Sequence, residues 1–138
     1  MRIFVSLCFW LLLAGFVYAK DPDGKYSGVD PAIREWIANL HSVGSTSRCC
    51  QLEDGQILAD TQWDFGTSSY RVFLVAPDGH TFADGSLGKW FDVPPDAIVA
   101  EPNRLGHALV WTRWYFGDDG RIVADGANIL CFLPGAGV

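Results

Sequence analysis

The residues with the most specific chemistry in this chain are three of its four cysteines: an adjacent pair, Cys49 and Cys50, and the distant Cys131. The fourth, Cys8, lies in the apolar run of an expected signal peptide and would be removed with it. Cysteines of exported proteins usually form disulfides, and an odd set predicts one bridge with one thiol left over. A bridge from the pair to Cys131 would close a loop of about 80 residues and contribute roughly 3–5 kcal/mol in the chain-entropy model. The pattern leaves open which of the two pairs with Cys131, and whether the third thiol is buried, paired with a second chain or reactive. A bridge within the adjacent pair is a strained alternative.

Thiol or metal chemistry at these cysteines is a second hypothesis. A cysteine nucleophile needs a base within hydrogen-bond reach, and His41, His80 and His107 are the candidates. No thiol-hydrolase signature surrounds the pair, which also lacks the two-residue spacer of a Cys-x-x-Cys redox site. A cysteine with a histidine would suit copper or zinc, but the histidines are far apart in the sequence. We therefore assign no catalytic residue, metal ligand or cofactor, and keep a thiol- or metal-dependent protein that uses Cys49 or Cys50 with a histidine as the alternative.

The segment 107–116 is the longest strand candidate, and it offers a binding face. Alternation along a strand places His107, Trp111, Arg113 and Tyr115 on one side. These side chains combine large aromatics with a cation and a titratable ring, a composition typical of recognition surfaces. We therefore take the four as candidate binding residues for a protein, small-molecule or glycan ligand. The competing interpretation is that the tryptophans fill the core, because large aromatics dominate small cores.

An amphipathic helix must position the cysteine pair. Asp30 is a suitable N-cap, and Pro31 suits the first helical position. Four apolar residues at helical spacing then share one face, namely Ile33, Trp36, Ile37 and Leu40. His41 falls in the last turn, and Gly44 is expected to end the helix. The helix therefore buries one face against the rest of the domain.

The chain after Cys50 has the short apolar and aromatic segments of a β-rich domain. The expected strands are residues 56–65, 70–76, 89–93, 107–116 and 129–133, and 81–82 is a candidate hairpin arm. Residues 96–99 fit either a helical turn or an extended piece. One helix followed by about five strands predicts an α+β fold, in which the N-terminal amphipathic helix packs on a small antiparallel sheet or a partly closed barrel.

The first 19 residues have the pattern of a secretory signal peptide. Arg2 precedes an apolar run that ends in Val17-Tyr18-Ala19, a small-residue cleavage pattern. The run is shorter than the roughly 20 residues of a membrane span, so cleavage fits better than a stable membrane anchor. Residues 20–29 would form a flexible lead-in, and 30–138 a single domain. The formal net charge of −6 argues against nucleic acid as a partner, because that needs clustered positive charge.

Short motifs also recur in a particular order along the chain. A Trp-bearing helix is followed by Ser-x-Cys-Cys with Asp54 soon after it, Trp-x-x-Val-Pro at 90–94, Gly-His at 106–107 and a closing Cys-Phe-x-Pro at 131–134. This combination resembles a family of small secreted proteins of bacteria and phages without an assigned function. Similar sequences often carry further cysteines where Gly55 and Trp111 stand here. The resemblance therefore implies that a second bridge is missing, and it implies a fold and a compartment but no activity.

These observations together predict an exported protein of the periplasm or the cell exterior. We expect a disulfide-stapled α+β domain that acts through binding or structure rather than catalysis.

Overall fold

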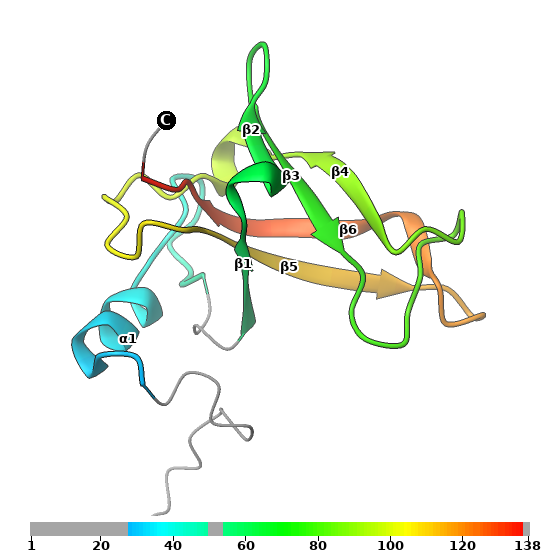
Figure 1. The fold of residues 1–138 in the computed structure, drawn as a ribbon, viewed down its shortest axis with the longest axis horizontal. Coiled ribbons are helices and arrows are strands. Elements are labelled where there is room, and N and C mark those ends of the chain that lie inside the picture. Colours follow the sequence, from blue (N-terminus) through cyan, green and yellow to red (C-terminus); the bar gives the residue numbers. More distant parts are fainter. Residues whose placement is uncertain (1–27, 50–53, 137–138) are drawn as a thin grey trace, which may run out of the picture.

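The computed structural model describes residues 28–49 and 54–136, and Figure 1 shows their arrangement. The expected signal peptide 1–19, most of the lead-in 20–29 and Cys50 lie outside these residues. None of the described helices is long and apolar enough to cross a membrane.

Helix α1 (Pro31–Ala38) begins where the sequence predicts. The Asp30 carboxylate accepts a hydrogen bond from the Ala32 N–H at 2.7 Å, which caps the first turn. The expected end at Gly44 is wrong, because the chain leaves the helix after Ala38. His41 therefore lies beyond the last turn, where it pairs with Arg48 in an antiparallel bridge.

The β-bridge between His41 and Arg48 explains how the helix positions the disulfide. The segment between His41 and Arg48 turns back on itself, so that the Cys49 N–H donates to the Leu40 carbonyl at 2.8 Å. The cysteine is thereby fixed at the end of α1 rather than at the start of a strand.

In the described residues, six strands form two antiparallel sheets of three strands each. The first sheet has the order β1-β5-β6, with β1 at Gly55–Leu58, β5 at Ala108–Phe116 and β6 at Ile122–Leu133. The second sheet has the order β2-β3-β4, with β2 at Trp63–Phe65, β3 at Tyr70–Val75 and β4 at Gly88–Asp92. The α+β class is confirmed, but the expectation of about five strands in one sheet or a partly closed barrel is wrong.

The segment 56–65 accounts for the difference, since it was expected to be one strand. It breaks at Ala59 into β1, a short 3-10 helix η2 (Asp60–Gln62) and β2. The Gln62 side chain accepts from the Ala59 N–H at 2.9 Å, and the Gln62 N–H donates to the Ala59 carbonyl at 2.8 Å. This local turn carries the chain from the first sheet to the second.

Two other expectations are corrected in the same region of the fold. Phe82 does not return as a hairpin arm, because β3 pairs with β4 and Phe82 forms an isolated bridge to Ile122. The last strand begins at Ile122 rather than at 129. Residues 96–99 were left undecided between a helical turn and an extended piece. The structure divides them: Asp96 and Ala97 belong to the 3-10 helix η3 (Pro95–Ala97), and Ile98 forms an isolated β-bridge to Phe132.

Two hydrophobic cores lie on the two faces of the first sheet. On one face α1 packs against β5 and β6, and the buried residues are Trp36, Ile37, Leu40, Cys49, Val99, Leu109, Trp111, Cys131 and Leu133. On the other face the second sheet packs against the first, and the buried residues are Leu58, Trp63, Val72, Leu74, Val93, Ala97, Ala108, Val110, Ile129 and Phe132. Both faces of the first sheet are therefore covered near the start of β5, where residues 108–111 are all buried.

Candidate functional site

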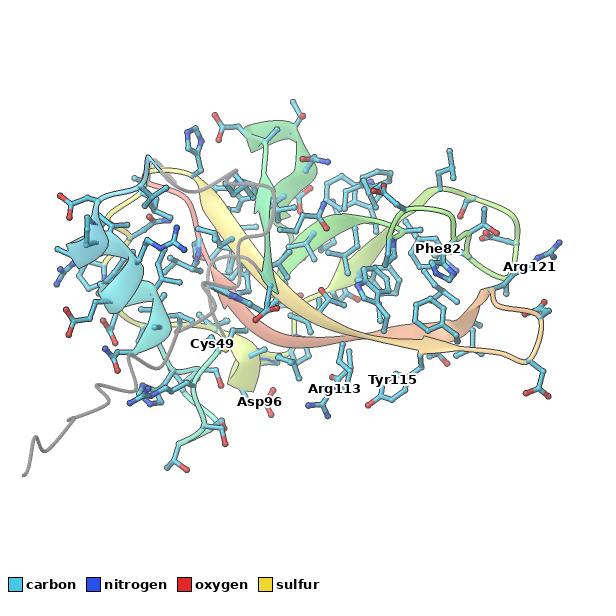
Figure 2. All side chains as sticks on the ribbon, turned by 90° about the horizontal axis from the view of Figure 1, so that it is seen from below. Cys49, Phe82, Asp96, Arg113, Tyr115 and Arg121 are labelled. Atoms are coloured by element: carbon cyan, nitrogen blue, oxygen red, sulfur yellow. A yellow bond between two sulfur atoms is a disulfide. The ribbon has the colours of Figure 1, made fainter. Side chains whose placement is uncertain are left out.

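A polar groove lies beside α1, at the part of β5 and β6 that the helix no longer covers. Its volume is about 410 Å³, within the range of small-molecule sites. Side chains of Arg113 and Asn128, which are register partners on β5 and β6, line the sheet side of the groove. Figure 2 shows Arg113 and Asp96 on the same side of the domain.

Two loops form the walls of the groove and are tied together by their backbones. The first wall is the turn at residues 42–48, and the second is η3 with Pro94. The Gly44 N–H donates to the Asp96 carbonyl at 2.9 Å, and the Val43 N–H donates to the Ile98 carbonyl at 2.8 Å. A side chain at Gly44 would overlap the Cβ of Asp96, so glycine permits this close approach.

The disulfide between Cys49 and Cys131 anchors the first wall to the sheet. Cys131 also lines the groove, although the two cysteines are only 1% and 3% exposed. The predicted bridge from the pair to Cys131 is thus confirmed, and Cys49 is the partner. The third cysteine, Cys50, lies outside the described residues.

Two arginines give the groove its electrostatic character. Within the described part of the chain, the side chains of Arg48 and Arg113 make neither an ion pair nor a hydrogen bond. Arg71 and Arg121, by contrast, face Asp64 and Asp119 at 2.6 and 3.9 Å. Both arginines of the groove therefore keep their donors available for a ligand.

Among the described residues that line the groove, Asp96 is the acidic one, so the three charged side chains there sum to one positive charge. Guanidinium groups recognise carboxylate and phosphate oxygens through paired, charge-assisted hydrogen bonds. Serine hydroxyls of the first wall, from Ser45 and Ser47, add further donors and acceptors. The described lining contains no histidine, and its guanidinium, carboxylate and hydroxyl groups can bind a ligand through charge and hydrogen bonds.

The structure separates the four predicted binding residues. Arg113 lines the groove, and Tyr115 follows it on the same face with 47% of its surface exposed. Trp111 is 1% exposed and packs in the core beneath α1, as the competing interpretation held. His107 is exposed and precedes β5, at the opposite end of this strand from Tyr115.

Sequence reasoning missed Arg48, Asp96 and Asn128. Alternation along β5 identifies Arg113, but the other three come from separate segments with no shared motif. Only the fold brings them to one groove.

The structure changes the hypothesis of thiol or metal chemistry in one respect. Cys49 is bonded to Cys131 and is therefore not a thiol in this structure. Among residues 28–49 and 54–136, no three His, Cys, Asp or Glu side chains gather in a way that could hold a metal ion.

No protein-family model, curated protein or solved structure matches this chain. The resemblance to small secreted proteins of bacteria and phages therefore rests on the sequence motifs alone.

Proposed function

We propose that this chain is an exported, non-catalytic binding domain whose groove takes a small ligand bearing a carboxylate. The signal-peptide pattern of residues 1–19 supports export, and the disulfide is consistent with an oxidising compartment. The ligand would lie between the turn at 42–48, η3 and the exposed ends of β5 and β6.

The observation that carries the proposal is the pair of unpartnered guanidiniums on one groove. The chain is acidic overall, with a net charge of −6, so carboxylates are plentiful as partners for surface cations. Arg48 and Arg113 nevertheless face the groove without one among the described residues. An incoming carboxylate would pair with both guanidinium groups without having to displace an existing ion pair.

The rigidity of the walls adds to the proposal. The bridge at Cys49, the backbone contacts of Gly44 and the buried floor fix the groove before a ligand arrives. A preformed site loses little conformational entropy on binding, which favours a small ligand over a segment that must fold.

Titration with succinate, observed by backbone amide NMR, tests the proposal. Succinamide is the matched uncharged probe, since it has the same carbon skeleton. We expect succinate, but not succinamide, to shift the amides of Ser45, Ser47 and Asn128. R48Q and R113Q should each weaken the apparent affinity about tenfold, the loss of one charge-assisted pair.

The control is R121Q, because Arg121 is an exposed turn residue that does not line the groove. This variant should retain the succinate shifts. Equal shifts with the two probes, or succinate shifts that survive in both R48Q and R113Q, would show that the groove does not recognise carboxylates.

A further inference from the structure

Strand β6 is an edge strand, and the middle of its outer edge is unpaired in the described structure. The first sheet has the order β1-β5-β6, so β6 has a neighbouring strand on one side only. At one end of the other side, the Ile122 N–H donates to the Thr81 carbonyl at 2.8 Å. At the other end, the Val99 N–H donates to the Phe132 carbonyl at 2.9 Å. Between them, no backbone hydrogen bond among the described residues joins residues 123–131 to a segment outside β5 and β6. We call residues 123–131 the open edge, since unpaired strand backbone is a template for a further strand.

The groove beside α1 reaches the open edge. Consecutive residues of β6 line it, namely Asn128, Ile129, Leu130 and Cys131. Successive side chains of a strand point to opposite faces, so a cavity that contacts such a run lies along the edge of the strand rather than on one face. The pairing of β5 with β6 shifts between Trp111 and Thr112, which leaves Leu130 without a partner on β5. The groove therefore borders strand backbone that the sheet does not fully pair.

The segment 94–99 determines where the open edge stops. Ile98 forms a parallel bridge to Phe132, so this segment lies beside β6 at that point. Immediately before it the chain coils into η3, where the Ala97 N–H donates to the Pro94 carbonyl at 2.9 Å instead of to β6. Pro95 in the same turn has no N–H to donate. A guest strand could therefore pair with β6 as far as residue 131, and it must end there because Ile98 occupies the next position.

Charges along the edge specify which end of a guest strand lies in the groove. Arg48 and Arg113 attract a C-terminal carboxylate and repel an N-terminal ammonium group. A C-terminus at this end of β6 makes the guest run parallel to β6, which is also the direction of both isolated bridges on this edge. Asp125 is exposed on the other half of the open edge. It favours a basic residue about four or five positions before the guest's C-terminus.

We propose that the carboxylate bound in the groove is the C-terminus of a short extended peptide, whose backbone pairs in parallel with the open edge of β6. The inference rests on the function proposed above, since it places the carboxylate on the same two arginines. Backbone pairing adds affinity that depends little on the peptide sequence, whereas the carboxylate restricts binding to chain ends. A five-residue strand is about 17 Å long and fits the open edge, whose residues span at most about 30 Å.

An NMR titration with four acetylated pentapeptides tests the proposal: Ac-Lys-Thr-Val-Thr-Xaa, in which the last residue is Ala, Ser, Val or Phe. The reference probe for each is the N-acetyl amino acid with the same last residue, which has the carboxylate but cannot pair along the edge. At least one pentapeptide should bind more tightly than its reference by about fivefold or more, the equivalent of one net hydrogen bond. The C-terminal amide of that peptide should bind more weakly than the acid by at least about the same factor.

Two N-methylated forms of the best peptide test strand pairing directly. Only alternate residues of a strand direct their N–H and C=O groups to one neighbour, so methyl groups on odd or on even residues have opposite effects. One form should lose the affinity gained over the reference probe, and the other should retain it. Hydrogen exchange should also slow at amides of residues 125–131 when the parent peptide binds, but not when the reference probe binds.

Protein variants test the two charged ends of the site. R113Q should reduce the affinity of the acid to that of the amide, and it should leave the affinity of the amide unchanged. D125K should weaken binding of the lysine-bearing peptide about fivefold. D60K is the matched control, because Asp60 is an exposed residue of η2 beside β1, and its substitution changes the net charge equally. This variant should bind the peptide as the parent protein does. A thermal melt followed by circular dichroism confirms that each variant is folded before its affinity is compared.

The proposal is overturned if no pentapeptide gains about fivefold over its reference, or if both methylated forms bind like the parent peptide. It is equally overturned if the newly protected amides lie in β1 or β4, or if sedimentation equilibrium shows that the open edge already pairs with a second copy of the chain. Succinate titration of the same samples separates the two proposals. Normal succinate binding without a peptide gain leaves the function of the groove intact and rejects the peptide, whereas loss of both succinate and peptide shifts in the groove rejects both.

Discussion

Removal of the Cys49–Cys131 bridge should cost a large share of the stability of this domain. The bonded cysteines are 82 residues apart in the sequence. In the chain-entropy model a loop of that length lowers the entropy of the unfolded chain enough to contribute about 4.5 kcal/mol at 25 °C. Small domains have total stabilities of roughly 5–15 kcal/mol, so this single bond is a large share.

The comparison requires a background in which no other thiol can replace the missing partner. We would use C50A as the parent and C49A/C131A/C50A as the bridge-free variant. Urea unfolding, followed by tryptophan fluorescence and far-ultraviolet circular dichroism, gives the free energy of unfolding of both. The bridge-free protein should lose about 4–5 kcal/mol, plus a smaller amount because both side chains are buried.

Two results would refute the reasoning. A loss below about 1 kcal/mol would mean that the unfolded chain is not appreciably constrained by the bridge. A bridge-free variant that is unfolded in water would also contradict it if the parent has a free energy of unfolding well above about 6 kcal/mol. C50A itself should retain the bridge, which peptide mapping under non-reducing conditions checks.

Two further predictions concern buried and surface polar groups. The Thr112 hydroxyl is buried without a hydrogen-bond partner in the described structure. T112V should therefore raise the free energy of unfolding by about 1 kcal/mol, measured by urea titration. A decrease would mean that the hydroxyl does have a hydrogen-bond partner. The hydrogen bond from Arg71 lowers the pKa of Asp64 below its ordinary value of 3.8. The pair therefore stabilises the fold at pH values above 3.8. This contribution is lost as the pH falls through the lowered pKa of the folded state. A carbon-detected NMR titration should therefore place the Asp64 midpoint below 3.8 and return it toward 3.8 in R71Q, whereas an unchanged midpoint in R71Q would contradict the assignment.

The local signals of the sequence were reliable where one short segment determines the structure. Asp30 and Pro31 specify the start of α1, because an N-cap acceptor and a proline without an N–H act within a single turn. The odd set of cysteines favoured a bridge from the pair to Cys131, while the choice of Cys49 depends on the turn that returns it to Leu40. The strand at 107–116 and its two faces also follow from residue alternation.

Only the tertiary structure decided what covers those faces. An eight-residue helix is about 12 Å long, whereas the nine residues of β5 extend about 30 Å. The helix can therefore bury Leu109 and Trp111 but leaves Arg113 and Tyr115 exposed, although all four point to the same side. Alternation specifies the direction of a side chain, and the reach of the neighbouring element specifies its burial.

The groove itself could not be read from the sequence, for the same reason. Arg48, Asp96, Arg113 and Asn128 carry no common spacing, and each alone is an ordinary surface residue. They meet because the backbone bonds of Val43 and Gly44 hold the 42–48 turn against Ile98 and Asp96, and because the disulfide from Cys49 to Cys131 anchors that turn to β6. The sequence by itself determined the class of fold, the start of the helix and the expectation of a disulfide from the cysteine pair to Cys131, since these depend on neighbouring residues and composition. The tertiary structure decided the site, since it depends on contacts between segments far apart in the chain.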